Sequence, residues 1–562
     1  MGLLTSANHK RDILREAALV HMPDEMRHIF AYLIIYFDIS EAHVLFREFV
    51  AHLNEDFFAQ TNDVQLATRL CLIRICEILH INGYDYNQFV NESINFEELR
   101  AYYQVVHEGV PDARYIASLN IEQRRIFDNL AEAIENPSSS NLFYIDGPRG
   151  SGKTFLYSAL TAYCLQRDVR FICVAFSGIA SSLLYKGCTV HSAFAIPLNT
   201  REGSRSYLRM NSSKASYLRS LSVIIWDEIS ITSKHIIDAA DDLFRQLMEN
   251  NHPFGGKIVI FGGDFRQVLP VVFHGTRALI MEVIAKKAEC WPNVTKFELT
   301  TNVRASEDPN FTEWVLSFGN GTALETMVDG VPKIEIIDSI RMSENMIGEL
   351  FGNYNQEIVS DEFAASSKVI LCATNEDVRK INALIIESLP GEKVTSFSHT
   401  YIESMDLSEI EAFNSDYLNS LNVAGLPSHE LRLAVGSPIL LLRNLNASQG
   451  LCNGTRLIVQ QVTQNLIKSK ISFGRRRGAV VLIPKIKLTY EGLELPFKLC
   501  RVQFPVCLAF AMTINKAQGQ TYNKVGLCFH QLGIERLKSH WYCLHRPYSD
   551  AHSPTHSHRS IV

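Results

Sequence analysis

One short stretch, residues 141–157, limits what this chain can fold into more than any other part of it. It opens with Leu142–Ile145, an apolar and aromatic run typical of a buried strand. Residues 147–154 then read GPRGSGKT, which fits the pattern G-x-x-x-x-G-K-[ST], and residues 155–165 read as a helix. A strand, a glycine-rich loop and a helix in this order predict a phosphate-binding loop in an α/β fold.

The residue types in this loop indicate what each would do. Gly147, Gly150, Ser151 and Gly152 form the part whose backbone N–H groups can surround an anion, and the glycines avoid side-chain clashes there. The N-terminus of the following helix adds the positive end of its dipole. Lys153 is expected to reach the terminal phosphates of ATP, and the Thr154 hydroxyl is expected to ligate Mg²⁺.

The length and composition of the chain set the wider limits. Its 562 residues are too many for one core, so several domains are expected, and 46% apolar with 20% charged residues is an ordinary globular balance. No apolar run is long enough to span a bilayer, and the start lacks the apolar core of a secretory signal. Twelve scattered cysteines without a C-x-x-C pair favour thiols in a reducing, intracellular setting. We expect the nucleus, with the mitochondrion as the alternative.

The region before the phosphate loop reads as helical. Residues 1–110 are rich in Leu, Ile and Phe, and helical spacing is clearest in Glu25–Phe37, Glu41–Leu53 and Val64–Ile81. No catalytic motif occurs there, so a helical accessory region is expected, with Cys71 and Cys76 in its core. The sequence does not indicate what this region does.

Polar residues around the loop are candidates for nucleotide and DNA contacts. Asn120 is a plausible N-cap for a helix through Ile134, and Gln123 could read an edge of adenine, although a solvated Gln is as plausible from the local pattern. After a strand at Arg170–Ala175, further candidates carry aromatic, hydroxyl or imidazole groups suited to bases or backbone phosphates. These candidates are Phe176, Ser177, His191 and Phe194, and as isolated residues the aromatics would more often lie in a core.

Two later strands and a loop supply the candidate catalytic groups. Leu221–Trp226 ends in Asp227 and Glu228, and carboxylates after a buried parallel strand face the ligand crevice. Asp227 is expected to hold Mg²⁺ and Glu228 to activate the attacking water. After a strand at Lys257–Phe261, Gln267 fits a γ-phosphate sensor. Arg304 is suited to contact the γ-phosphate from a neighbouring lobe.

A second lobe is expected to follow. Lys368–Cys372 reads as a strand before a helix, and a small β-rich insertion follows, with an arginine run at residues 475–477 that is more often a solvated hairpin tip than a phosphate contact. The stretch AMTINKAQGQT, residues 511–521, places hydroxyl, amide and lysine groups at one helix start, where they suit phosphates of DNA or ATP. Its candidates are Thr513 and Asn515 for DNA, and Lys516, Gln518 and Gly519 for ATP.

Taken together, these motifs resemble those of the Pif1-like branch of superfamily-one DNA helicases, relatives of RecD. The matching stretches include FSGIASSLL, TVHSAFAIP, VIIWDEIS, GGDFRQVLPV, LTTNVRA and LRNLNASQGLCNGTRL, and the resemblance covers roughly residues 115–528. The version looks like the helicase part of Helitron-type transposon proteins. The resemblance implies two RecA-like lobes, an SH3-like insertion in the second, Mg²⁺-ATP hydrolysis and 5′-to-3′ travel along single-stranded DNA. It also implies roles in recombination, repair and telomere maintenance.

The ending departs from the family. After Cys528 the family continues into a helix bearing Y-V-A-L-S-R, whose Arg completes the ATP site from the second lobe. Here residues 529–562 are rich in His and Ser, and Tyr542–Arg546 is a one-residue-short echo of that motif. The tail histidines lack ligand spacing, so no metal site is expected there.

The predicted organisation has four parts: a helical region at 1–110, a first RecA-like lobe at 111–325, a second at 326–530 with an insertion at about 416–505, and a divergent tail at 531–562.

Three functions are considered. The first is an ATP-dependent DNA helicase that binds ATP, single-stranded DNA and duplex junctions, does not bind a membrane and acts as a monomer. The second is a relic that binds ATP and single-stranded DNA but turns over poorly. The third, an unrelated phosphate-loop ATPase or kinase, would need no second-lobe DNA motif. Net charge is −6, so DNA binding would need a local basic groove.

Overall fold

A computed structural model of the chain describes most of its length. The described residues are 6–528 except 20–21, 38–41, 91–93, 102–110, 137–140, 149, 273–274, 302–308, 321, 323–324, 329–330, 335–344, 353–362, 390, 404–412, 424, 447–448, 475 and 493–494. The chain divides into two compact units. The first joins residues 1–107, 353–366 and 379–510, and the second joins residues 108–352, 367–378 and 511–562.

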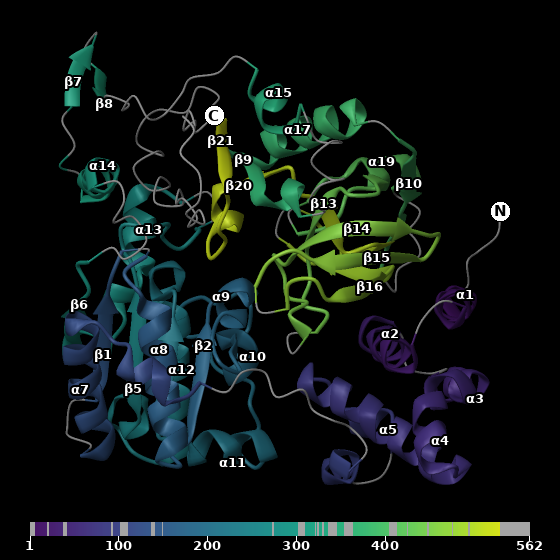
Figure 1. The fold of residues 1–562 in the computed structure, drawn as a ribbon, viewed down its shortest axis with the longest axis horizontal. Helices are drawn as coiled ribbons and strands as arrows, with labels where there is room; N and C mark the ends of the chain where they lie inside the picture. Colours follow the sequence, from purple (N-terminus) through teal and green to yellow (C-terminus); the bar gives the residue numbers. More distant parts are fainter. Residues whose placement is uncertain are drawn as a thin grey trace. The chain divides into compact units, whose positions relative to one another are not determined.

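The second unit is built on a six-stranded parallel sheet (Figure 1). Its strand order is β3-β2-β4-β5-β1-β6, and every neighbouring pair is parallel. The strands are β1 (Leu142–Asp146), β2 (Phe171–Ala175), β3 (Cys188–Thr189), β4 (Val223–Asp227), β5 (Ile258–Gly263) and β6 (Thr295–Glu298). The sheet confirms the α/β lobe predicted around the phosphate loop.

Both faces of this sheet are covered, which explains why its strands read as continuous apolar runs. Along β4, Ile224 and Trp226 belong to one hydrophobic core, while Val223 and Ile225 belong to another. The covering helices are α7 (Ile121–Glu135), α8 (Lys153–Gln166), α9 (Gly178–Ser182), α10 (Val190–Phe194), α11 (Ser213–Ser220) and α12 (Lys234–Met248), whereas α13 (Arg277–Val283) buries none of its residues. Asn120 caps α7, as predicted, by accepting from the backbone N–H of Gln123 at 2.8 Å.

A second, smaller parallel sheet lies in the same unit. Its order is β20-β9-β21, with strands β9 (Lys368–Cys372), β20 (Ala511–Thr513) and β21 (Lys524–Cys528). Because β9 pairs with strands more than a hundred residues later, the sequence between them is an insertion into this lobe. The remaining elements of the unit are α14 (Pro309–Asn320), β7 (Glu325–Val328), β8 (Val331–Ile334) and α15 (Met346–Phe351), and α17 (Asn375–Ser388) continues from one unit into the other.

The insertion is an antiparallel β domain in the first unit. Its main sheet has the order β16-β15-β14-β13-β19, beside sheets β11-β18-β17 and β10-β12. The elements are β10 (Lys393–Phe397), β11 (His399–Ile402), α19 (Ser415–Ser420), β12 (Glu430–Ala434), β13 (Pro438–Leu441), β14 (Arg456–Val462), β15 (Leu466–Ile471), β16 (Val480–Pro484), β17 (Ile486–Tyr490), β18 (Leu499–Gln503) and β19 (Val506–Leu508). Arg476 and Arg477 lie in the turn between β15 and β16, as predicted, and Arg477 packs over the Phe363 ring at 4.6 Å, while Arg475 lies outside the described residues.

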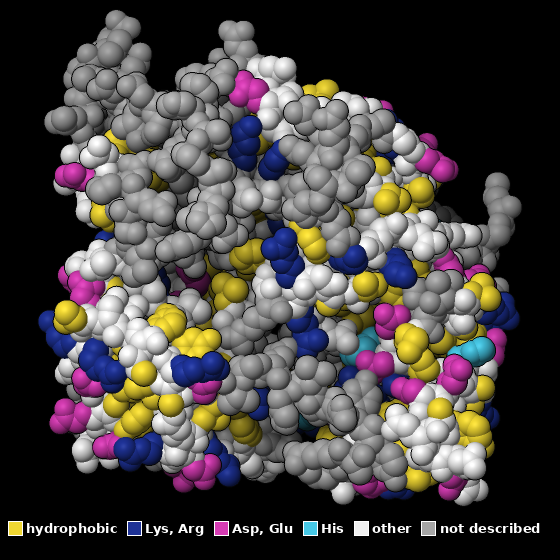
Figure 2. All heavy atoms as spheres, in the orientation of Figure 1, with side chains coloured by type: hydrophobic (Ala, Val, Ile, Leu, Met, Phe, Trp, Pro, Cys, Tyr) yellow, Lys and Arg dark blue, Asp and Glu magenta, His cyan; other side chains and the backbone are white. Residues whose placement is uncertain are grey.

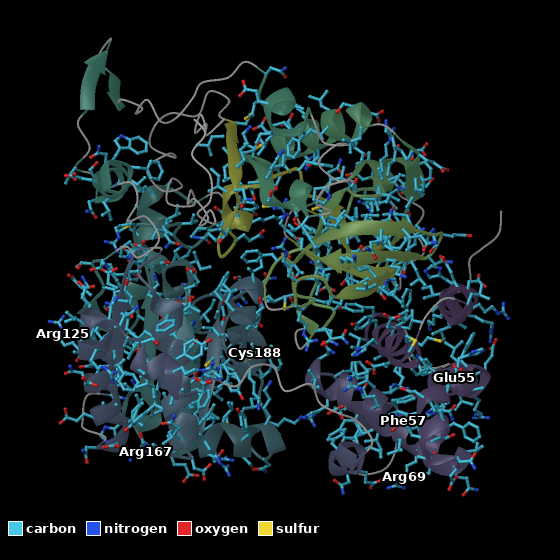
Figure 3. All side chains as sticks on the ribbon, in the orientation of Figure 1. Glu55, Phe57, Arg69, Arg125, Arg167 and Cys188 are labelled. Carbon is cyan, nitrogen blue, oxygen red and sulfur yellow. The ribbon has the colours of Figure 1, made fainter. Side chains whose placement is uncertain are left out.

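The N-terminal region is helical, as predicted. Its helices are α1 (Ser6–Ala18), α2 (Pro23–Tyr36), α3 (Ala42–Leu53), α4 (Glu55–Thr61) and α5 (Val64–Ile81). Phe57 is fully buried among them, whereas Glu55 and Arg69 are exposed on their outside (Figure 3). Cys71 and Cys76 lie in the same core, which confirms their predicted place.

These helices share a core with the β insertion, which the sequence did not predict. Tyr32 of α2 belongs to the insertion's hydrophobic core, while Leu466 and Leu482 of the insertion belong to the helical core. Their polar contacts are equally direct, since Tyr36 Oη donates to the backbone oxygen of Asn444 at 2.5 Å. The N-terminal region and the insertion therefore fold as parts of one unit.

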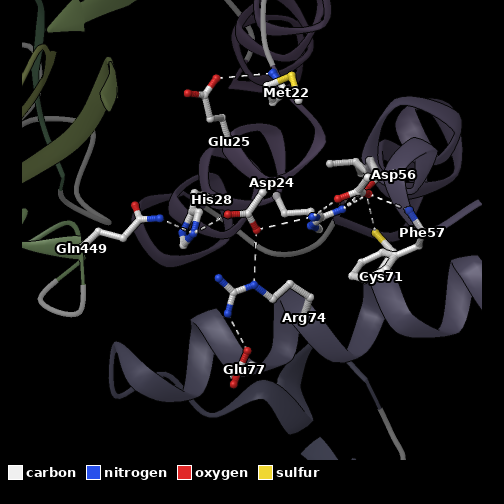
Figure 4. Close-up of polar contacts among 12 residues, drawn as sticks. Met22, Asp24, Glu25, His28, Asp56, Phe57, Cys71, Arg74, Glu77 and Gln449 are labelled. Carbon is white, nitrogen blue, oxygen red and sulfur yellow. Dashed lines mark hydrogen bonds and ion pairs between the residues drawn. The ribbon is translucent and has the colours of Figure 1, made fainter. Parts of the chain in front are cut away.

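A buried network of charges supports this junction (Figure 4). The Asp24 carboxylate is shared by Arg74 at 3.3 Å and by His28 at 3.6 Å. The His28 ring in turn meets the side-chain amides of Asn446 at 3.0 Å and Gln449 at 2.7 Å. Since buried charges are tolerated only when paired, this network fixes the position of α2.

Surface charge shows no dominance of one sign. On the face drawn in Figure 2, Lys and Arg side chains are interspersed with Asp and Glu over the described parts, which agrees with the net charge of −6. Among the described residues, no helix combines the length and apolar character needed to cross a bilayer.

Candidate active site

The phosphate loop connects β1 to α8. Gly150 and Gly152 have φ of 90° and 83°, a left-handed backbone that favours glycine, so both are required by the turn itself. Helix α8 begins at Lys153, whose ammonium donates to the carbonyl oxygens of Gly147 and, at 3.5 Å, Pro148. Thr154 lies in the first turn of α8 and is exposed. Loop and lysine are thus placed as an anion site requires.

The neighbouring strands β4, β5 and β1 end at the same edge of the sheet, and β4 and β1 each end in a carboxylate. β4 ends at Asp227, which is level with Gly262 in β5, and Asp146 at the end of β1 pairs with Gly263. Because carboxyl ends of parallel strands meet at the ligand crevice, Asp227 faces the phosphate loop. Burial raises the pKa of Asp227 above its ordinary value, and the nearby charge of Lys153 opposes that rise.

Glu228 has an unusual backbone. Its φ of 57° and ψ of 42° are left-handed, although it carries a Cβ. Such conformations cost roughly 1–3 kcal/mol and concentrate at functional sites. The activation of an attacking water by Glu228 stays a prediction.

Gln267 is buried close to this edge, but its amide nitrogen is already used. It donates to the Asp264 carboxylate at 3.2 Å, and the same carboxylate accepts from Arg266 Nε at 2.5 Å. Arg266 also reaches Asp146 at 3.0 Å. Gln267 is therefore held in place by an ion-paired aspartate, and its γ-phosphate role stays a prediction.

Gln123 contacts the phosphate loop directly. Its Nε2 lies 3.4 Å from the carbonyl oxygens of Ser151 and Gly152, and its Oε1 accepts from the backbone N–H of Asn120. The adjacent Glu122 accepts from the Thr300 hydroxyl, which is the main reason that its pKa is lowered, and from the backbone N–H groups of Thr300 and Thr301 at 3.2 Å. Both groups of the Gln123 amide are engaged here, so its reading of adenine stays a prediction.

The DNA candidates separate into buried and accessible groups. The prediction that Phe194 stacks on a base is wrong for this fold, because Phe194 is fully buried against Trp226 and Phe244. His191 is also buried, and its Nδ1 lies 3.2 Å from the backbone oxygen of Ile196. Phe176 and Ser177, by contrast, are partly exposed.

The second-lobe stretch differs in local structure from the prediction. Residues Ile514–Ala517 form a single 3₁₀ turn rather than the start of an α-helix, so no full helix dipole supports this position. Asn515 is exposed, while Thr513, Lys516 and Gln518 are half-buried. A Cβ on Gly519 would lie 3.2 Å from Ile179 Cγ2 of α9, so this stretch meets the FSGIASS stretch within one unit. Arg304 and the tail with Arg546 lie outside the described residues.

The donor set suits Mg²⁺ rather than a softer metal. Thr154 and Asp227 offer a hydroxyl and a carboxylate, the oxygen ligands that Mg²⁺ prefers alongside phosphates and waters. Within the described part of the chain, no group of three or more His, Cys, Asp or Glu is arranged to hold a metal by itself.

Several residues that complete the site were not predicted from the sequence. Tyr157 donates to Asp227, Asp146 and Asp264 bind Arg266, and Glu122 holds the Thr300–Thr301 turn. The only local signal for Tyr157 was its place one helical turn after Lys153. The others depend on pairing between distant segments.

Fold and site together define a phosphate-loop NTPase with two parallel α/β lobes. Residues 118–329 match the family model of the PIF1-like helicase, and residues 416–462 match that of the 2B domain of DNA helicase Pif1. Over these residues the chain is similar to PIF1-like helicases. Solved structures agree on the fold: Pif1 helicase from Bacteroides with ADP-AlF3 and single-stranded DNA gives a TM-score of 0.54 at 22% identity, covering 79% of this chain and 94% of that one. Pif1 from Candida albicans gives 0.52 at 20%, covering 76% and 92%.

Curated relatives are similarly distant in sequence. The ATP-dependent DNA helicase Pif1 of Bdellovibrio bacteriovorus is 24% identical over 411 residues, which cover 72% of this chain and 81% of the relative. The helicase PIF1 of Xenopus laevis is 24% identical over 407 residues, covering 69% and 54%. The chain thus spans about half the length of its vertebrate relative.

Proposed function

We propose that this chain is an ATP-dependent DNA helicase that couples Mg²⁺-ATP hydrolysis to 5′-to-3′ movement on single-stranded DNA. One observation supports the proposal most: Lys153 lies close enough to Asp227, at the carboxyl edge of the sheet, for its charge to act on the pKa of that carboxyl, in a chain similar to DNA helicases. DNA recombination, repair and telomere maintenance in the nucleus, by a monomer, are part of the same proposal.

The residues divide the work between binding and hydrolysis. The loop amides and Lys153 bind the phosphates of ATP, and Gln123, which lies against the loop, reads an edge of adenine in this proposal. Thr154 and Asp227 would hold Mg²⁺, which when bound neutralises charge on the β- and γ-phosphates. Glu228 accepts the proton of the attacking water, while Gln267 and Arg304 respond to the γ-phosphate.

Single-stranded DNA is proposed to contact the partly exposed Phe176 and Ser177 together with Thr513 and Asn515. Phe176 supports this role because an accessible ring can stack on a base. Ser177 caps the short helix α9 by accepting from the N–H of Ala180, so its hydroxyl keeps a fixed place near backbone N–H groups. Such N–H and hydroxyl groups are common phosphate partners.

A second candidate follows from the changed ending of the chain. With Y-V-A-L-S-R missing after Cys528, the protein would bind ATP and single-stranded DNA but hydrolyse slowly. The ATPase rate of the purified chain with and without single-stranded DNA separates the two. Strong stimulation by DNA supports the helicase, and binding with little turnover supports the relic. Absence of ATP binding under both conditions would refute both.

A further inference from the structure

The side chain of Tyr157 lies one turn into α8 and points at the acidic end of β4. Its Oη donates to Asp227 Oδ1 at 3.1 Å, and both side chains are almost completely buried. The tyrosine hydroxyl is the donor in this pair, because an ionised carboxylate can only accept. The carboxylate accepts a second hydrogen bond, from the backbone N–H of Glu228.

The neighbouring strand leaves room for this hydroxyl. A Cβ on Gly262 of β5 would lie 1.5 Å from Tyr157 Oη and 2.8 Å from its Cζ. No real side chain tolerates such distances, so only glycine fits at this position beside Tyr157. A phenylalanine at position 157 would fill the core equally well, and it would not need the space that Gly262 leaves. The glycine is therefore explained by the hydroxyl group of Tyr157 and not by packing of its ring.

We propose that Tyr157 is a positioning residue for the metal-holding carboxylate. By donating to Oδ1, its hydroxyl fixes the rotamer of Asp227, so that the carboxylate would be held in one orientation for Mg²⁺. It also compensates part of the cost of keeping a charged carboxylate in a buried place. This inference rests on the proposed Mg²⁺-ATP site and adds a residue that the loop and strand motifs do not contain.

The test is the Mg²⁺ dependence of ATP binding by the full chain, measured with a fluorescent ATP analogue. In Tyr157→Phe, we expect the Mg²⁺ concentration for half-maximal binding to rise about tenfold, since a hydrogen bond to a charged group contributes on that scale. Binding in EDTA should stay as in the wild type, because the loop amides and Lys153 are unchanged. A role in packing alone would leave the Mg²⁺ dependence unaltered.

A matched control lies on the same helix. Tyr163 of α8 also donates to a carboxylate, Glu135 Oε1 at 2.5 Å, but far from the site, so Tyr163→Phe should bind like the wild type. Gly262→Ala is a second variant that tests the same hydrogen bond, because the added Cβ must displace the Tyr157 hydroxyl. We expect this variant also to need a higher Mg²⁺ concentration for half-maximal ATP binding.

The possible failures are distinguishable. If the wild type shows no Mg²⁺-dependent binding, the proposed ATP site itself is wrong. If the wild type does, and Tyr157→Phe has the same Mg²⁺ requirement, the positioning role is wrong. Loss of binding in EDTA by a folded Tyr157→Phe variant would also overturn it, because the defect would then lie in the loop.

Discussion

The Nδ1 atom of His28 in helix α2 lies 3.0 Å from the side-chain amide nitrogen of Asn446 in the β insertion, 418 residues further along the chain. Asp24, Arg27 and Arg74 are the charged groups facing this ring. Burial outweighs the carboxylate and lowers the pKa of His28, and burial also lowers the pKa of His9 in α1 to about 4. Both shifts favour the neutral form of the imidazole in the folded unit.

This arrangement predicts that the first unit loses stability in acid. Between about pH 6.5 and 4 the unfolded chain binds protons that the folded chain does not, so the stability is full above pH 6.5 and falls as the pH is lowered through that window. His28→Gln should flatten the dependence measured by thermal unfolding, whereas the same change at the exposed His43 should not. An unfolding temperature independent of pH in this window would contradict the prediction.

Lys153→Ala should abolish most hydrolysis. The change removes the charge expected to neutralise the β- and γ-phosphates, so the ATPase rate should fall by roughly two orders of magnitude or more. Arg167→Ala, at the exposed far end of the same helix, serves as the control. Near-normal turnover in purified Lys153→Ala would refute the assignment of the phosphate loop.

Glu228→Gln should separate binding from hydrolysis. The amide keeps the shape of the side chain and tolerates the left-handed backbone as well as Glu does, but it cannot accept the proton of water. ATP should bind normally while hydrolysis fails, which leaves a stable complex with ATP and DNA. If nucleotide binding disappears together with hydrolysis, Glu228 has a metal-holding or structural role.

The two phenylalanines near the DNA candidates should behave differently. Phe194→Ala removes a fully buried ring and should destabilise the lobe by roughly 3–5 kcal/mol, measured by thermal or denaturant unfolding. Phe176→Ala should instead weaken binding of single-stranded DNA and leave ATP affinity unchanged. Equal DNA affinity of Phe176→Ala and wild type would remove this ring from the proposed DNA surface.

The ending of the chain should limit turnover. An arginine delivered to the γ-phosphate contributes roughly 10³–10⁵ in rate in phosphoryl transfer, and the family's second-lobe Arg is absent or replaced by Arg546. We expect the chain to bind ATP and single-stranded DNA but to unwind duplex poorly. Replacing residues 529–562 with a helix carrying Y-V-A-L-S-R should restore DNA-stimulated hydrolysis. Brisk duplex unwinding by the unaltered chain would contradict this prediction. If Arg546→Ala then abolished that unwinding, the tail would be shown to supply the arginine.

Local patterns in the sequence determined the phosphate loop, the strands before Asp227 and Gln267, and the helices of the N-terminal region. These features depend on residues within one or two turns or one strand, so glycine spacing, apolar runs and helical periodicity are enough to predict them. The cap at Asn120 and the positive φ of Gly150 and Gly152 belong to the same group.

Only the tertiary structure decided which side chains meet across the fold. It buried Phe194 against Trp226, joined Tyr157 to Asp227 across 70 residues, and placed α2 against an insertion four hundred residues later. Whether an aromatic ring faces a core or a ligand depends on which distant segments cover it. A single sequence without pairing information does not contain that choice, because the same apolar and polar pattern fits either outcome.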